Sequence, residues 1–198
     1  MFLGLMALFV IATVPLARGR FEPLAEMHFR WLPLLFAALL GQILITVTFP
    51  NAPSALLAGT HVATYVAAGW VLWVNRRIPG IVLIAAGAAL NAIPIIVNRG
   101  TLPANSTAEQ TAGVHASAHF ANSGVLAHPH LAFLGDTMTS PAFLPFRNVV
   151  SPGDLVILAG LAVLAHVTCG SLIGRTLVRA RRRLQVVLTL RRRLRPAG

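Results

Sequence analysis

The sequence predicts an all-α protein: a five-helix transmembrane bundle with an extracytoplasmic loop element and an arginine-rich cytoplasmic tail. Three observations lead to this prediction. Of the 198 residues, 56% are apolar and only 11% are charged, unlike a typical water-soluble domain. Five long apolar runs contain no Asp, Glu, Lys or Arg. All 16 basic residues are arginines, and they gather in the segments on one side of those runs.

The five runs are residues 2–17, 31–49, 56–74, 81–97 and 155–174. A hydrocarbon core of about 30 Å takes roughly 20 residues of helix. Lipid offers no hydrogen bonds to the backbone, so each run is expected to be helical. The first run has Arg18 and Arg20 behind it and no basic residue before it, the reverse of a secretory signal. We therefore expect a retained helix, with cleavage near Pro15 as the alternative.

Arginine placement predicts the orientation, because cytoplasmic segments of membrane proteins collect basic residues. One side holds Arg18, Arg20, Arg30, Arg76 and Arg77, together with the nine arginines of residues 175–195. The other side holds two, at positions 99 and 147. The N-terminus is thus predicted outside a bacterial plasma membrane and the C-terminus in the cytoplasm. Residues 1–174, with the outer loop 98–153, form the five-span domain, and residues 175–198 form the tail.

Polar side chains within the runs are few. Gln42, His61 and Asn91 lie at similar depths, about 8–10 Å from the outer ends of their runs. We expect them to form one hydrogen-bonded layer that holds the helices together, with a polar solute or proton path as the alternative. The runs contain no carboxylate, which favours the structural interpretation. His166, near the middle of the fifth run, is expected to be neutral and bonded to a neighbouring helix.

The outer loop carries helix signals at both ends. Ser106 and Glu109 have the spacing of a capping box and predict a short helix that ends near Gly113. Ser151 and Asp154 have the same spacing at the start of the fifth run, with a proline suited to the first helical position between them.

The same loop holds candidate metal ligands, His115, His119, His128 and His130. The first two are four residues apart and would share a helix face, which makes a zinc or copper site conceivable. Ordinary surface histidines are the favoured interpretation, because the spacing fits no established metal site. Asp136 is expected to pin the loop by pairing with an arginine, at position 99 or 147.

The tail alternates arginines with aliphatic residues. Leu177, Leu184 and Leu188 share one helix face, although Arg181 and Arg195 lie close to it. We expect the tail to bind anionic lipid headgroups. Nucleic acid is not expected as a partner, because the tail has no aromatic residue to stack on bases. The headgroup-binding residues are predicted to be Arg179, Arg181, Arg182, Arg183, Arg191, Arg192 and Arg193.

Several patterns argue against an enzyme. One cysteine excludes a disulfide framework and a four-thiolate metal site within this chain. No glycine-rich phosphate loop and no nucleophile with a positioned base can be found, so neither catalysis nor a cofactor is expected. The favoured function is a non-enzymatic membrane component that packs against lipids, partner proteins or its own copies. The alternatives are a small-solute or ion permease and an extracytoplasmic metal-binding protein.

Three stretches carry a resemblance: residues 98–103, residues 133–136 and residues 148–154. In them the sequence resembles a bacterial family of small multi-pass membrane proteins whose function is unknown. The resemblance implies a bacterial cytoplasmic membrane and adds no activity. The loop residues that it marks as structural are Asn98, Gly100, Pro103, Gly135, Asp136, Ser151, Gly153 and Asp154.

Overall fold

The computed structural model describes residues 2–48, 54–112, 123–140 and 148–193, and these residues are mostly helical, as predicted. The α-helices are α1 (Phe2–Leu16), α2 (Glu22–Ala25), α3 (Leu32–Thr48), α4 (Ser54–Val74), α5 (Ile81–Val97), α6 (Ser106–Ala112), α7 (Pro152–Thr168) and α8 (Leu172–Arg193). A short 3-10 helix, η1, covers Ala132–Leu134. The strands are β1 (Leu102–Pro103), β2 (Ser123–Gly124), β3 (Met138–Thr139) and β4 (Val149–Val150).

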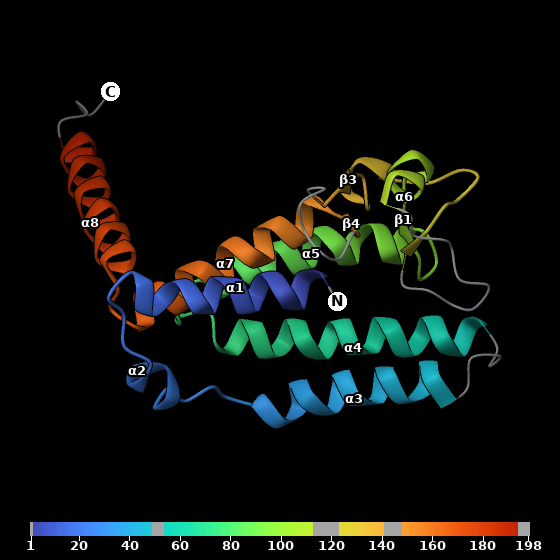
Figure 1. Ribbon diagram of the computed structural model, residues 1–198, viewed down its shortest axis with the longest axis horizontal. Helices are drawn as coiled ribbons and strands as arrows, with labels where there is room; N and C mark the ends of the chain where they lie inside the picture. The colour runs from blue at the N-terminus through green and yellow to red at the C-terminus, as the bar shows by residue number, and fades with distance from the viewer. Residues whose placement is uncertain (1, 49–53, 113–122, 141–147, 194–198) are drawn as a thin grey trace.

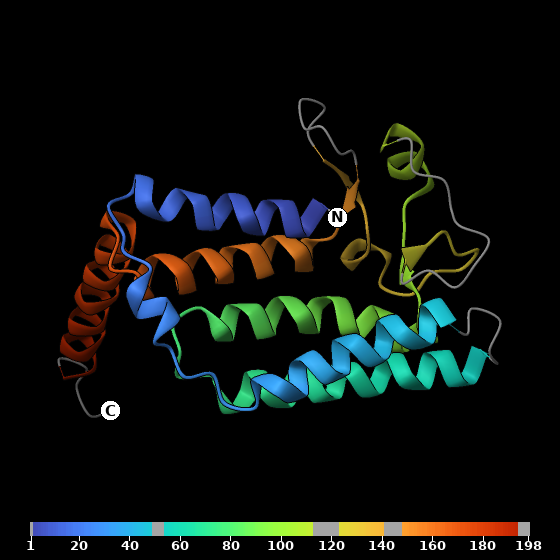
Figure 2. The ribbon, with the colours of Figure 1, turned by 60° about the horizontal axis from the view of Figure 1, so that its bottom comes forward.

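Helices α1, α3, α4, α5 and α7 run side by side, as Figures 1 and 2 show from two directions. The most extensive contact joins α5 to α7, α1 packs on α7, α4 packs on α5, and α3 packs on α4. One end of this bundle carries α2 and α8. The opposite end carries α6 and the four strands, with β1 parallel to β2 and β3 antiparallel to β4.

Glycines explain the close contact between α5 and α7. Gly80 and Gly87 are seven residues apart, or about two helical turns, and Gly153 and Gly160 have the same spacing on α7. A Cβ atom on Gly87 would lie 2.6 Å from the Gly153 carbonyl oxygen. A Cβ atom on Gly160 would lie 2.7 Å from the backbone nitrogen of Ile84. The two antiparallel helices therefore meet backbone to backbone, which only small residues allow.

The first four predicted runs agree with α1, α3, α4 and α5 to within two residues at each end. The prediction for the fifth run was wrong at its C-terminal end. Helix α7 begins earlier, at Pro152, and stops at Thr168. Gly170 then adopts a φ of +59°, which glycine tolerates best, and α8 starts at Leu172. An uncharged run does not reveal a break between two helices. The tail was therefore predicted to begin at residue 175, three residues after the start of α8.

Within the described ranges, no single helix is both long and apolar enough to cross a membrane alone. Helix α7 and residues 172–189 of α8 satisfy that test only as a pair, and the pair is bent by 98°.

Two asparagines hold connecting segments at opposite ends of the bundle in the same way. Directly after α4, Asn75 accepts a hydrogen bond from the backbone nitrogen of Arg30 (2.9 Å) and donates one to the carbonyl of Arg30 (2.8 Å). Directly after α5, Asn98 makes the same pair of bonds to His130, at 2.9 and 2.8 Å. In both cases the next residue, Trp31 or Leu131, has a positive φ. Each clamp therefore fixes a sharp change of chain direction.

We predict that Gly160→Leu destabilises the fold by about 3 kcal/mol, because a side chain there collides with the backbone of α5. The matched control is Gly69→Leu in α4, where an added Cβ meets no atom within 4 Å. That control should be neutral or slightly stabilising, because leucine favours helix over glycine. Thermal unfolding followed by circular dichroism measures both variants, and equal midpoints for the two would contradict the glycine contact.

Candidate functional site

A cluster of buried polar side chains joins α5 to α7 at the end of the bundle near the strands. The Asn91 side chain is 8% exposed, and its nitrogen donates to a carboxylate oxygen of Asp154 at 2.9 Å. Its oxygen accepts a hydrogen bond from the Ser151 hydroxyl, also at 2.9 Å. Ser151 is fully buried. Amide, hydroxyl and carboxylate thus satisfy one another, as buried polar groups must.

The start of α7 builds its half of this cluster. The Asp154 backbone nitrogen donates to the Ser151 hydroxyl (3.0 Å), and the Ser151 nitrogen donates to the second Asp154 carboxylate oxygen (3.3 Å). This is the capping box expected there, with Pro152 as the first helical residue. Gly153 leaves the space that the Asn91 side chain fills, since a Cβ atom there would overlap the Asn91 amide oxygen.

The predicted layer of Gln42, His61 and Asn91 is reached only at Asn91. Its partners are Ser151, the N-cap of α7, and Asp154 in the first turn of α7, not the side chains expected from α3 and α4. The side chains of Gln42 in α3 and His61 in α4 lie outside the described part of the structure. Whether the layer extends to these two helices stays a prediction.

The loop residues marked by the resemblance gather at the end of α5. Asn98 clamps His130, and Gly100 has a φ of +105° with its nitrogen 2.7 Å from the Ile95 carbonyl. Pro103 in β1 accepts a hydrogen bond from the Asp136 backbone nitrogen at 2.8 Å. Gly135 has no room for a side chain, because a Cβ atom would overlap the Pro103 carbonyl. These residues shape one compact element.

Asp136 is a buried acid within that element. Its carboxylate accepts a hydrogen bond from the Ser123 hydroxyl at 2.5 Å, and its backbone carbonyl accepts one from Asn105. The expected pairing with an arginine was wrong for Arg99: among the described residues the partner of the carboxylate is a hydroxyl. The other expected partner, at position 147, lies outside the described residues.

The environment of Asp136 penalises its charge. Burial raises the pKa of Asp136 from its ordinary value to about 6, and the hydrogen bond from Ser123 acts in the opposite direction. The negative charges of Asp154 and Glu109 raise the pKa further. Asp136 therefore loses its proton at a higher pH than an aspartate in water does.

The predicted cap of the short loop helix was placed one residue too late. Helix α6 begins at Ser106, and Asn105 caps it by accepting hydrogen bonds from the backbone nitrogens of Thr107 (2.9 Å) and Ala108 (3.2 Å). The Asn105 nitrogen is itself bonded to the Asp136 carbonyl, which positions the cap. Asparagine and serine both cap helices well. The spacing favoured Ser106 because Glu109 follows it three positions later, as in a capping box.

The predicted metal ligands are not brought together by the described part of the chain. His128 and His130 are exposed, and His115 and His119 lie outside the described residues. Within the described ranges, no group of three His, Cys, Asp or Glu side chains could hold a metal ion. The metal site thus stays a prediction.

His166 lies in the last turn of α7, not near the middle of a helix, and it bonds to a neighbouring helix as expected. Its Nε2 atom is 3.1 Å from the hydroxyl of Thr13 in α1, and its Nδ1 atom is 2.9 Å from the Ser171 hydroxyl. The Thr13 hydroxyl donates to the Val10 carbonyl, so it accepts from Nε2. Ser171 also accepts a hydrogen bond from the Gly174 nitrogen at 3.0 Å, so the ring, Ser171 and the start of α8 form one bonded unit.

Helix α1 also fixes the turn between α7 and α8. The Leu172 nitrogen donates to the Ala17 carbonyl at 2.8 Å, and the Arg20 nitrogen donates to the Cys169 carbonyl at 3.0 Å. Together with the bonds of Ser171, these contacts hold the direction in which α8 leaves the bundle. Apart from the glycine at position 170, no residue pattern predicts this turn.

One known protein family matches most of this chain. A model for a family of unknown function, DUF5317, matches residues 26–166. The chain belongs to this family. The DUF5317 match begins after α2 and ends at His166, so it contains the polar cluster and the loop element, whereas α1 and α8 lie outside it. No curated protein matches the chain. No solved structure matches it either.

Beyond the DUF5317 match, α8 is two-sided over most of its length. At about 100° per residue, six aliphatic residues share one face and Arg175, Arg179 and Arg182 lie opposite, whereas Arg181 and Arg183 flank that face and Arg191 falls on it. Four of the predicted headgroup residues are exposed: Arg179, Arg181, Arg182 and Arg183. The other three belong to α8, but the structure does not describe their side chains: Arg191, Arg192 and Arg193. We call the following residues the apolar stripe: Ile173, Leu177, Ala180, Leu184, Val187 and Leu188.

We predict that the stability of the wild-type protein falls as the pH rises from about 4 to about 6. In that range the folded state holds a proton on Asp136 that the unfolded chain has already lost. The contribution is on the order of 2 to 3 kcal/mol, and it is fully present only below about pH 4.

The measurement for Asp136 compares thermal unfolding of wild type and Asp136→Asn across this range, with Glu26→Gln, an exposed acid that does not act on Asp136, as the control. The asparagine variant should lose this part of the pH dependence, and the control should keep it. A wild-type profile that matches that of Asp136→Asn would show that the acid is not perturbed.

We also predict that Asn91→Leu destabilises the protein by about 2 kcal/mol, since it leaves the Ser151 hydroxyl and one Asp154 oxygen without their partner. Gln185→Leu on the exposed surface of α8 is the control and should have little effect. Gln42→Leu then tests the wider layer, because loss of stability there would extend it to α3. An unfolding midpoint of Asn91→Leu equal to that of the wild type would contradict the structural role of the cluster.

Proposed function

We propose that this protein is a five-span integral protein of a bacterial plasma membrane, with its N-terminus outside and its C-terminus in the cytoplasm. It serves there as a non-enzymatic component that binds the anionic inner leaflet and packs against partner membrane proteins or its own copies. Helices α1, α3, α4, α5 and α7 are the proposed spans, and α8 is the proposed leaflet-binding element.

The outer surfaces of the bundle support a lipid environment. Phe9 of α1, Phe36 of α3 and Val66 of α4 are all more than 60% exposed. Many further large apolar side chains on these helices are exposed as well. Monomeric proteins in water rarely expose contiguous apolar patches beyond a few hundred Å². Acyl chains would cover this surface.

Charge and aromatic residues support the orientation. Arg18, Arg76 and Arg77 lie at the end of the bundle that carries α8, opposite the strands (Figure 1). Trp31 and Trp73, exposed near the start of α3 and the end of α4, belong to the same end. Basic residues mark the cytoplasmic side of membrane proteins, and tryptophans mark the interface.

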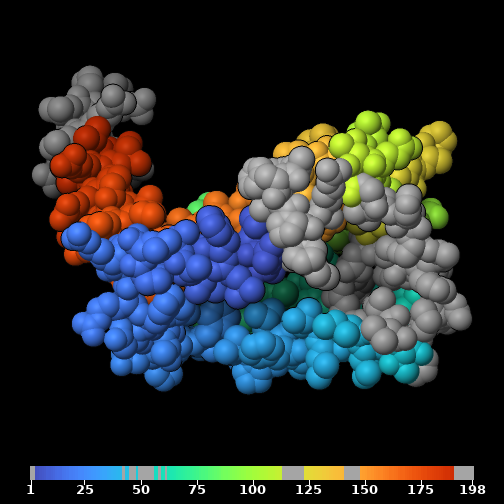
Figure 3. All heavy atoms as spheres, in the orientation of Figure 1, coloured from blue at the N-terminus to red at the C-terminus, as the bar shows by residue number. Residues whose placement is uncertain are grey.

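The observation that carries the proposal is the geometry of α8. This 22-residue helix leaves α7 at 98° and stands away from the bundle in Figure 3. With α7 across the bilayer, α8 would lie nearly flat on the surface. Its apolar stripe would enter the headgroup layer, with Arg175, Arg179 and Arg182 opposite. Each basic residue close to an anionic leaflet contributes about 1 kcal/mol of attraction.

The polar cluster favours a packing role over transport. Asp154 is the group on which a permease function would rest, because a carboxylate among helices is a common ion or proton carrier. Both of its oxygens already accept hydrogen bonds, from Asn91 and from the Ser151 backbone. The carboxylate is thus engaged in joining α5 to α7.

The proposal predicts that trypsin reaches the arginines of α8 only from the cytoplasmic side. Full-length protein is expressed in bacteria, and intact spheroplasts are compared with inverted membrane vesicles. Cleavage within α8 should occur in the inverted vesicles alone and should become faster at high salt, which weakens binding to anionic lipid.

Two variants test whether α8 binds the membrane through its apolar stripe. Leu184→Asp changes the centre of the apolar stripe, and Val186→Asp changes the basic face; both side chains are 59% exposed. Cleavage of Leu184→Asp should be several-fold faster than wild type, and cleavage of Val186→Asp much closer to it. Equal rates for the two variants would refute docking through the stripe, and cleavage in spheroplasts would refute the orientation.

A further inference from the structure

Three arginines outside α8 gather where α3 begins and α4 ends. The buried Asn75 bonds to both the backbone nitrogen and the carbonyl of Arg30, which brings the start of α3 beside the end of α4. Arg76 and Arg77 follow Asn75 directly. Two segments 45 residues apart in sequence therefore present three exposed guanidinium groups in one place, which we call the basic cluster: Arg30, Arg76 and Arg77.

One guanidinium of the basic cluster is held by a neighbouring residue, and none of the three forms an ion pair within the described structure. The Arg76 guanidinium lies 4.4 Å from the centre of the Trp73 ring and donates to the Trp73 carbonyl at 2.8 Å. Among the described residues, Arg20 pairs with Glu22, and no arginine of the basic cluster forms an ion pair. Guanidinium groups bind phosphate with paired hydrogen bonds, so this surface suits a phosphate group.

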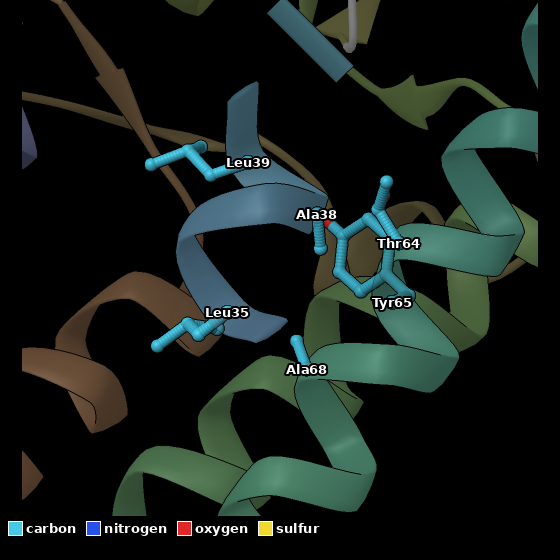
Figure 4. A pocket seen from close by; sticks show the side chains of 6 residues that line it. All are labelled: Leu35, Ala38, Leu39, Thr64, Tyr65 and Ala68. Carbon is cyan, nitrogen blue, oxygen red and sulfur yellow. The ribbon is translucent and has the colours of Figure 1, made fainter. Parts of the chain in front are cut away.

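An apolar groove lies between the same two helices. Its lining comes from Leu35, Ala38 and Leu39 of α3 and from Thr64, Tyr65 and Ala68 of α4, with the Tyr65 ring beside Ala38 (Figure 4). Its volume is about 160 Å³. A cavity of about 150 Å³ holds one benzene molecule, so the groove fits a short length of hydrocarbon and not a drug-sized ligand.

The groove and the basic cluster have the spacing of the two parts of a phospholipid. Leu35 lies about 5 Å along α3 from its first residue, and Ala68 lies about 9 Å along α4 from its last residue. The basic cluster adjoins those same helix ends. A phosphate held there would thus have its acyl chain enter the groove within one or two helical turns.

We propose that the α3–α4 pair binds one anionic phospholipid, with its phosphate on the basic cluster and part of one acyl chain in the groove. This inference rests on the proposed membrane location. It adds a specific site that is distinct from the surface attraction of α8. The exposed indoles of Trp31 and Trp73 would lie at the level of the glycerol and ester groups, where tryptophan is favoured.

The experiment measures binding of long-chain phosphatidylglycerol to the detergent-purified full-length protein by native mass spectrometry. Glycerol phosphate serves as a headgroup-only probe, and phosphatidylcholine serves as a lipid without net charge. The variants are Arg76→Gln/Arg77→Gln in the basic cluster and Ala68→Leu in the groove. The matched control, Arg18→Gln/Arg20→Gln, removes the same number of exposed arginines from the segment that follows α1. Thermal unfolding checks that every variant is folded.

Wild type and the Arg18→Gln/Arg20→Gln control should retain one phosphatidylglycerol molecule with equal affinity. The Arg76→Gln/Arg77→Gln variant should bind it roughly tenfold more weakly or worse. Ala68→Leu should also weaken binding of the lipid while leaving binding of glycerol phosphate unchanged. The site would be overturned by wild-type affinity in the variant of the basic cluster, by equal retention of phosphatidylcholine, or by an unaltered lipid affinity in Ala68→Leu.

These outcomes are independent of the trypsin experiment on α8. A protein that fails the docking test can still retain one lipid on α3 and α4. Conversely, loss of lipid binding in the Arg18→Gln/Arg20→Gln control alone would refute the site on α3 and α4.

Discussion

The backbone contact between α5 and α7 is the constraint on which the rest of the structure depends. Glycines at two levels bring the helices so close that no side chain fits between them. At this separation the Asn91 amide can reach Ser151 and Asp154 directly, and the start of α7 is fixed against α5. Helix α1 then packs on α7, and α4 packs on α5, so the central pair positions both flanks.

The connections are held by amide side chains, not by charge. Asn75 and Asn98 each extend a helix end by bonding to both backbone groups of a residue far away in sequence. This arrangement satisfies donor and acceptor together and leaves nearby guanidinium groups available. With five acidic residues against 16 arginines in the chain, the described part forms a single ion pair, at its exposed surface.

Sequence reasoning succeeded where the signal is local. Apolar runs located α1, α3, α4 and α5, and the spacing of Ser151 and Asp154 located the start of α7. It failed where the answer depends on a distant partner. The end of α7 is set by a glycine turn bonded to α1, the neighbour of Asp136 is Ser123, and Asn105 caps α6 because Asp136 holds its backbone. The glycines of α5 and α7 were visible singly, but their pairing required the fold.

The rigid corner at Gly170 has a mechanical consequence. Because hydrogen bonds to α1 and to His166 fasten both arms of the corner, α7 and α8 form one L-shaped body. Any force that lifts or lowers the outer arm becomes a torque on the inner arm. The far end of that inner arm begins at Ser151 and Asp154, so a tilt of α8 would also move the residues that bond to Asn91.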